Sequence, residues 1–353
     1  MYYPPETRVS SLTTIRRERM LPVAGEVLVQ PNQRVEPWDV VAQAAVPGGY
    51  HIVEIAQALK ITEKEVPQCL LKHEGEDVKA GEPIAVRRGL FRRALRSPAD
   101  GFLAAVGGGR ALIEADTRVV ELIAGMRGRV TEVRRNRGCI IETIGAIVQG
   151  IWGNNQEGHG VLKALSDSPH NTLTREDIKV GSQGAVILAG QALTLRALEF
   201  AQEMQVRGII VGSLSIELLP AARAATFPIV VTEGWGAISM SPIIFDVLKS
   251  NDGREVALSA WLKTGWEQRR PEVIIPRVAN EPPAEELAFD LVLEKGATVR
   301  VLRPPHTGAT GTVLDFPALP RKLETGMTLR GAEIELISGQ RIFVPLANLE
   351  WIH

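Results

Sequence analysis

The sequence predicts a multidomain, β-rich protein with a central segment in which helices and strands alternate. Its 353 residues exceed what one ordinary core organises, so we expect two to four domains. Glycine (33) and proline (22) are frequent while aromatic residues make up 5%, which favours short strands joined by tight turns. Between residues 181 and 260, apolar runs alternate with helical patterns, which indicates a parallel sheet covered on both faces.

Changes of composition divide the chain into four expected parts. Residues 1–20 show no strand alternation and are expected to form a tail, either solvated or used for docking. Residues 21–150 are expected to form a β domain with a helical insert at about 50–71. Residues 151–280 follow as a three-layer α/β domain with an entry loop and an exit strand, and residues 290–353 as a small β domain.

A repeat with a spacing of 43 residues lies in the first β domain. Residues 31–42 and 74–85 each contain a turn, an apolar anchor, a second turn and an apolar strand end. Such units come from short strands joined by tight turns. Between them, Thr62 followed by Glu65 predicts a capping box. The matched pairs of the repeat are Val35 with Val78, Val41 with Ile84, and Ala42 with Ala85.

The second unit continues into the sequence S-P-A-D-G-F-L at residues 97–103. With the turns before it, this resembles the barrel-sandwich hybrid, the fold of biotinyl and lipoyl carrier domains. The resemblance implies that fold over about Gly25 to Ile144, and it implies no activity. The residues that carry it are Gly75, Val78, Gly81, Ile84, Ala85, Ser97, Pro98, Asp100 and Gly101.

Carrier domains present a modified lysine on a tight hairpin, and this chain departs from that pattern. Residues 87–96, at the corresponding place, hold five arginines and no lysine. We therefore expect no biotin, no lipoate and no other cofactor. A second arginine run lies between residues 127 and 137. The residues expected to contact a partner are Arg87, Arg88, Phe91, Arg92, Arg93, Arg96, Arg134, Arg135 and Arg137.

Arginine pairs with carboxylates and with phosphates, so these runs suit either an acidic protein or a nucleic acid. Leu90, Phe91 and Leu95 interrupt the first run and favour a protein surface. A solvated loop is an equal alternative for that run. We therefore expect a protein partner, with acidic character, ahead of nucleic acid.

The central domain is predicted from three apolar strands, at residues 185–188, 208–212 and 228–232. Ligands of parallel sheets gather at the carboxyl ends of the strands. The alternative is a set of tight strand-to-helix turns with Trp235 as a lid on the core, and this alternative leads. The candidate ligand residues at these ends are Gly190, Gln191, Gly212, Ser213, Thr232, Glu233, Gly234 and Trp235.

A second unusual loop spans residues 149–160 and holds four glycines. Glycines let a backbone approach a partner closely, and Trp152, Glu157 and His159 offer side-chain contacts. The leading alternative is an interdomain joint with a buried tryptophan.

The last 60 residues resemble a KOW motif in an SH3-like barrel, as found in transcription elongation factors and some ribosomal proteins. The closing segment 344–350, V-P-L-A-N-L-E, is similar to the end of such barrels. Seven basic and six acidic residues between 291 and 353 give weak support for RNA binding. The residues on motif positions are Gly296, Val299, Val301, Gly308, Gly311 and Val313.

Chemical motifs are scarce in this sequence. The histidines and cysteines lack the spacing of metal sites, so we expect no metal, and phosphate loops and nucleophile elbows are missing. The net charge is −1, from 40 basic and 41 acidic residues, and no signal peptide or membrane span is evident.

From this pattern we expect a cytoplasmic, non-catalytic adaptor or scaffold for protein partners, near the transcription or translation machinery. Two alternatives stay open. One is an enzyme or small-molecule sensor with its ligand site at the strand-end loops. The other is an RNA-binding protein that uses the KOW-like segment and the arginines.

Overall fold

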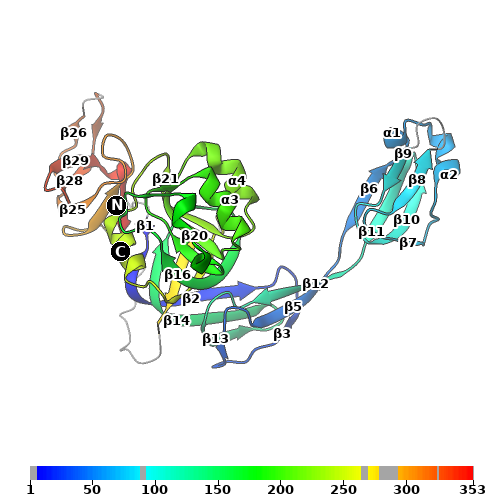
Figure 1. Cartoon of the computed structure of the whole chain (residues 1–353), viewed down its shortest axis with the longest axis horizontal. Helices are drawn as coiled ribbons and strands as arrows, with labels where there is room; N and C mark the ends of the chain where they lie inside the picture. The colour runs from blue at the N-terminus through cyan, green and yellow to red at the C-terminus, as the bar shows by residue number, and fades with distance from the viewer. Residues whose placement is uncertain (1–5, 88–92, 264–268, 278–292, 324–325, 353) are drawn as a thin grey trace.

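The computed structural model describes residues 6–87, 93–263, 269–277, 293–323 and 326–352 (Figure 1). Strands hold 47% of the chain and helices 15%, which confirms a β-rich fold. The strands form several sheets, and no sheet closes into a barrel within these ranges. None of the helices in the described ranges is long and apolar enough to cross a membrane.

The three predicted parallel strands are present at the centre of the molecule as β18 (Ala185–Leu188), β20 (Gly208–Leu214) and β21 (Ile229–Trp235). β16 (Glu157–Ala164), whose first residues were expected to form a loop, adds a fourth, and the four strands lie side by side, each parallel to the next. The residues of β18 are all buried, as are those of β20, which explains why these strands are apolar runs without alternation.

Helices cover both faces of these strands. α3 (Leu195–Glu203) and α4 (Leu219–Ala224) pack on one face, in the same core as Ile209. α5 (Pro242–Lys249) packs on the other, in the same core as Ile210. Because successive residues of a strand point to opposite faces, one strand supplies both cores.

The central sheet also has antiparallel strands, and it begins earlier in the chain than residue 151, where the sequence placed its start. β22 (Glu255–Ser259), β23 (Glu272–Pro276) and β14 (Gly138–Gln149) continue it with antiparallel pairing. The expected boundary at residue 150 therefore falls at the end of a strand of this sheet. Local sequence gives no sign of this, because β23, the strand that joins β14 to this sheet, lies far away in the sequence.

In place of the expected tail over residues 1–20, the structure has β2 (Val9–Met20), which pairs antiparallel with β14. Its charged residues hid the strand from sequence reasoning, but its three arginines all have acidic partners in the fold. Arg17 forms an ion pair with Glu272, and Arg19 lies at 2.9 Å from Glu157.

Residues 50–115 form a separate lobe with its own core, at the far end of a narrow neck (Figure 1). Part of the expected helical insert is wrong, because residues 50–54 form a strand on the edge of the lobe's sheet. The capping box of Thr62 and Glu65 is confirmed. The elements of the lobe are β6 (Tyr50–Glu54), α1 (Ile55–Leu59), α2 (Val66–Cys69), β7 (Asp77–Val78), β8 (Pro83–Arg87), β9 (Arg93–Arg96), β10 (Gly101–Gly107) and β11 (Arg110–Ala115).

The lobe repeats a strand arrangement of the body next to it. In the lobe, strands run in the order β6-β11-β10-β7, with β8 paired to β9. In the body, the order β2-β14-β13-β4 has the same antiparallel pairing, with β5 paired to β12. The further strands of this body copy are β3 (Glu26–Val27), β4 (Arg34–Val35), β5 (Val40–Val46), β12 (Arg118–Ile123) and β13 (Gly128–Arg134).

Hydrogen bonds confirm the 43-residue repeat inside these two copies. The backbone N–H of Glu36 donates to the Asp39 carboxylate at 2.8 Å, and that of Lys79 donates to the Glu82 carboxylate at 2.9 Å. Both turns therefore have the same side-chain cap, although their residues differ.

The second halves of the copies also agree. The pairing of β13 with β14 is irregular between Val130 and Glu132, and that of β10 with β11 between Leu103 and Ala105. The cores use equivalent residues as well. These are Val35, Val41, Val130 and Ile141 in the body copy, and Val78, Ile84, Leu103 and Ile113 in the lobe.

The lobe is inserted into a hairpin of the body copy. β5 and β12 pair with Val46 opposite Arg118, and the chain between these two residues makes the whole lobe. The repeat seen in the sequence is thus one strand arrangement nested inside another.

The C-terminal strands form a six-stranded sheet next to the central one (Figure 1). β1 (Glu6–Thr7) joins this sheet and runs parallel to its strand β30. The remaining strands are β24 (Thr298–Val301), β25 (Thr310–Asp315), β28 (Gly331–Leu336), β29 (Arg341–Pro345) and β30 (Leu349–Ile352).

Candidate functional site

The strand-end residues singled out in the sequence meet at one edge of the central sheet. Ser213 is fully buried, and its hydroxyl lies 3.0 Å from the carbonyls of both Gln191 and Gly236. The backbone N–H of Gly212 donates to the carbonyl of Gly190 at 2.9 Å. The loops are therefore bonded to one another across the ends of β18, β20 and β21.

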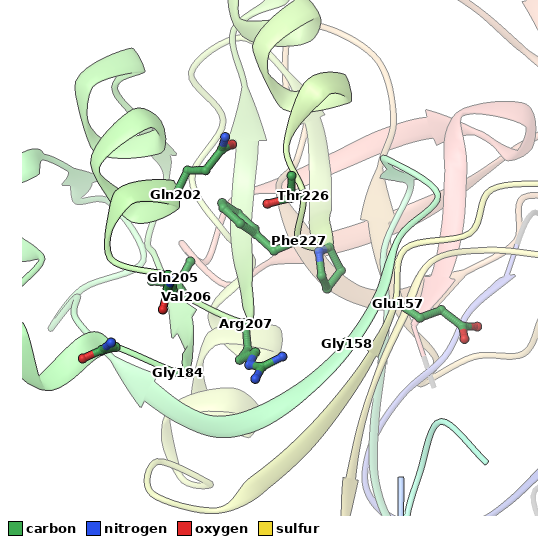
Figure 2. Close-up of a pocket in the computed structure, with 11 residues that line it drawn as sticks. Glu157, Gly158, Gly184, Gln202, Gln205, Val206, Arg207, Thr226 and Phe227 are labelled. Atoms are coloured by element: carbon green, nitrogen blue, oxygen red, sulfur yellow. The ribbon is translucent and has the colours of Figure 1, made fainter. Parts of the chain in front are cut away.

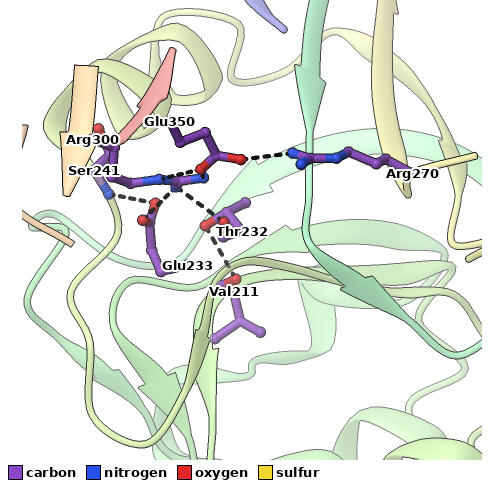
Figure 3. Close-up of polar contacts among 7 residues, drawn as sticks. All are labelled: Val211, Thr232, Glu233, Ser241, Arg270, Arg300 and Glu350. Carbon is purple, nitrogen blue, oxygen red and sulfur yellow. Dashed lines mark hydrogen bonds and ion pairs between the residues drawn. The ribbon is translucent and has the colours of Figure 1, made fainter. Parts of the chain in front are cut away.

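Glu233, at the end of β21, is committed to the C-terminal sheet. Its Oε2 lies 2.5 Å from Nη1 of Arg300 on β24, and both side chains are buried (Figure 3). Its Oε1 accepts the backbone N–H of Ser241 at 2.9 Å. Arg300 also donates to the carbonyl of Thr232 at 3.2 Å. This edge of the sheet is thus covered by a neighbouring sheet.

Arg300 has a second carboxylate, that of Glu350 on β30. Nε of Arg300 lies 2.9 Å from Glu350, and Arg270 approaches the same carboxylate at 2.7 Å (Figure 3). Burial alone disfavours the charged Arg300, but the carboxylates of Glu233 and Glu350 outweigh it and raise the pKa of Arg300 above its ordinary value. Removing one partner of such a buried group costs about 3–5 kcal/mol.

Trp235 and Gln191 occupy the outer part of the same edge. Trp235 is 39% exposed and meets the buried Trp152 edge to face, with ring centroids 5.4 Å apart. The Gln191 amide donates to the carbonyl of Ala237 at 2.7 Å. The ligand role of the strand-end residues stays a prediction, and the tight turns and the Trp235 contact fit the alternative of a lid.

Residues 149–160, which were expected to form a loop, include β15 (Trp152–Gly153) and the start of β16 and are built into the body of the protein. Asn154 is buried, donates to the carbonyls of Ala222 in α4 and of Phe227 after it, and accepts the backbone N–H of Ile229 at 3.0 Å. His159 lies against Trp38, with ring centroids 5.6 Å apart. Burial first, and then the charge of Arg207, lowers the pKa of His159.

An open depression of about 540 Å³ lies at the opposite, amino ends of the parallel strands (Figure 2). Gly184, Arg207 and Pro228, each directly before a strand, line it. Donors and acceptors on its wall suit a polar molecule, and these belong to Gln183, Gln202, Gln205 and Thr226. Sequence reasoning missed this site because it considered the carboxyl ends only; the glutamines were the available signal.

The two arginine clusters lie in different parts of the molecule, β8 and β9 in the lobe and β13 in the body (Figure 1). Arg88, Phe91 and Arg92 fall outside the described residues. Arg87 donates to the carbonyl of Lys60 at 3.1 Å and Arg96 to that of Gly81 at 2.6 Å, while Arg93 is exposed.

In the second cluster, Arg134 forms an ion pair with Glu132 at 2.6 Å, and Arg137 donates to the carbonyl of Pro22. Arg135 is exposed. Local partners thus take up part of the positive charge that the sequence suggested was available to a binding partner.

The lobe exposes large apolar side chains close to its neck. Tyr50 and Ile52, two residues apart on β6, are 65% and 66% exposed. Single exposed apolar residues are ordinary on protein surfaces, but a group of them marks a contact surface. Sequence reasoning placed Tyr50 and Ile52 in a helix and so gave them no role.

Comparison with models of protein families gives no match, and comparison with curated proteins gives no relative.

Proposed function

We propose that this protein is a non-catalytic adaptor that binds protein partners through the lobe of residues 50–115. The observation that carries the proposal is the projection of this lobe, with its own core, from a body that has the same strand arrangement (Figure 1). A lobe held away from the body is accessible on most sides, which suits contact with a large partner.

At the level of fold, we propose that both copies are barrel-sandwich hybrids and that the C-terminal sheet is a relative of the SH3-like barrel. The turn sequences of residues 75–85 and 97–101 support the first assignment. Carrier domains present their modified group on one hairpin. In the body copy, the equivalent hairpin, formed by β5 and β12, carries the lobe instead. The KOW-like segment extends the proposal to a place beside the transcription or translation machinery.

The body supports this role as a platform. Arg300 joins the central and C-terminal sheets through the buried carboxylates of Glu233 and Glu350. Arg19 on β2 and Glu157 on β16 tie the body copy to the central sheet. A partner that binds the lobe is therefore held at a fixed attachment point on a larger unit.

Site-specific photocrosslinking tests the proposal. A benzophenone amino acid is placed at Ile52 in the lobe, and at Val180, which is 80% exposed in the body, as the matched control. In native cells we expect a defined protein crosslink from position 52 and a weaker or different pattern from position 180. Equal crosslinking from both positions, or none from position 52, contradicts the proposal.

A further inference from the structure

The outer face of the lobe's sheet carries a row of four side chains that alternate between aromatic and acidic. Tyr50 on β6 lies opposite Glu114 on β11, Glu114 lies opposite Phe102 on β10, and Phe102 lies opposite Asp77 on β7. Residues directly opposite each other in an antiparallel sheet point to the same face. The row faces away from the core, because the core uses the neighbouring positions, such as Ile113.

The body copy has a row at the same four positions, and its composition differs. Arg16 on β2 lies opposite Glu142 on β14, Glu142 opposite Arg129 on β13, and Arg129 opposite Arg34 on β4. Nε of Arg16 lies 2.5 Å from the Glu142 carboxylate. In this copy the acidic residue in the row is paired with a cation of the same sheet.

Comparison of the two rows shows what the lobe lacks. Glu114 and Glu142 occupy equivalent positions, but the neighbours of Glu114 are Tyr50 and Phe102 where those of Glu142 are arginines. Among the described residues, no cation is paired with the Glu114 carboxylate. A carboxylate between two aromatic rings favours a cation, through charge and through the faces of the rings.

Nearby charges leave this position open. Lys72 forms an ion pair with Glu82 at 2.9 Å and donates to the backbone carbonyl of Asp77, so its contacts lie at the Asp77 end of the row. Arg110 pairs with Glu54 at 2.8 Å, two residues further along β6 from Ile52. Neither of these two cations is paired with Glu114.

The next row and the edge of the sheet indicate the shape of the occupant. Ile52 lies opposite Leu112, which adds an apolar row beside Glu114. β6 is the end strand of the lobe's sheet, so its outer backbone groups can pair with an added strand. We infer that this face binds an extended segment of a protein partner that carries arginine or lysine, with the cation between Tyr50 and Phe102 on Glu114. The inference rests on the proposed function and adds the chemistry of the partner.

Binding of a fluorescein-labelled peptide of alternating valine and arginine to the full chain tests this inference. The control peptide carries citrulline, which has nearly the shape of arginine without its charge. We expect saturable binding of the arginine peptide, and at least tenfold weaker binding of the citrulline peptide. Glu114→Gln should weaken binding of the arginine peptide at least tenfold, or about 1.4 kcal/mol. Glu142→Gln, at the equivalent position of the body copy, should leave it unchanged.

A second variant guards against loss of folding. The double change Tyr50→Arg with Phe102→Arg copies the row of the body, in which arginines already flank a glutamate on the same strand arrangement. We expect this variant to keep the circular dichroism spectrum of the wild type and to lose the peptide.

Three results overturn the inference: no binding by the wild type, equal binding of both peptides, or full binding by both lobe variants. If crosslinks from position 52 persist alongside any of these, the lobe still binds a partner and only the basic chemistry is wrong. Loss of those crosslinks with intact peptide binding contradicts the proposed function instead.

Discussion

Glu233 and Arg300 form a buried ion pair between the end of β21 and the C-terminal sheet, with Oε2 and Nη1 2.5 Å apart. The two residues are 67 positions apart in sequence. Glu233 was predicted to contact a ligand, and in the structure it joins the central sheet to the C-terminal sheet.

We predict that Arg300→Met destabilises the protein by about 3–5 kcal/mol, because it leaves Glu233 buried without its cation and takes one arginine away from Glu350, which keeps Arg270. Urea unfolding monitored by circular dichroism measures the change. The control is Arg341→Met, which removes an exposed ion pair with Glu335 in the same sheet and should cost about 0–1 kcal/mol. Equal losses of stability in the two variants would contradict the proposal that Arg300 joins the central and C-terminal sheets.

Stability should also depend on pH through His159. Burial and Arg207 lower the pKa of His159 in the folded state, while the unfolded value is about 6.5. Between these two values the unfolded chain binds more protons, so stability falls as the pH falls below about 6.5. We expect the melting temperature to drop more between about pH 7.5 and 5.5 in the wild type than in His159→Asn. A drop of the same size in both would refute the assignment.

Two glycines of the lobe are required for different reasons, one for close contact with a neighbouring strand and one for its backbone conformation. Gly101 has a φ of +154°, and a Cβ there would lie 2.0 Å from the carbonyl oxygen of Glu114. Gly75 has a φ of +86° with open space around it. Both alanine variants should destabilise the lobe, and Gly101→Ala should destabilise it more, because the backbone must also move. Hydrogen exchange of the lobe amides measures both, and a larger effect at Gly75 would contradict this account.

Much of the central sheet could be predicted from sequence, because buried parallel strands are apolar throughout. β18 has the predicted bounds. β2 could not be predicted, since its arginines are paired with acids such as Glu272 and Glu157, which lie far away in the sequence. A local pattern cannot show such partners.

The sequence repeat was recognised, but its nesting was not. The buried positions match between copies, as Val35 does with Val78, because both cores need an apolar residue there. The exposed positions differ between copies, as Arg16 does from Tyr50. The order of the strands depends on which strands pair, and the local sequence does not show this. The candidate site was also predicted only in part. The strand ends were expected to converge, but the sequence did not indicate that Arg300 is the partner of Glu233.

The central claim is that the body copy is complete without the lobe and that the lobe binds the partner. Because Val46 lies opposite Arg118, a two-residue Asn-Gly turn can replace residues 47–117 and close the hairpin. The decisive measurement is quantitative mass spectrometry of proteins captured from native cells by the full chain and by this variant. We predict that the variant stays folded and loses the proteins captured by the full chain. An unfolded variant, or a folded one that retains those proteins, would contradict the account.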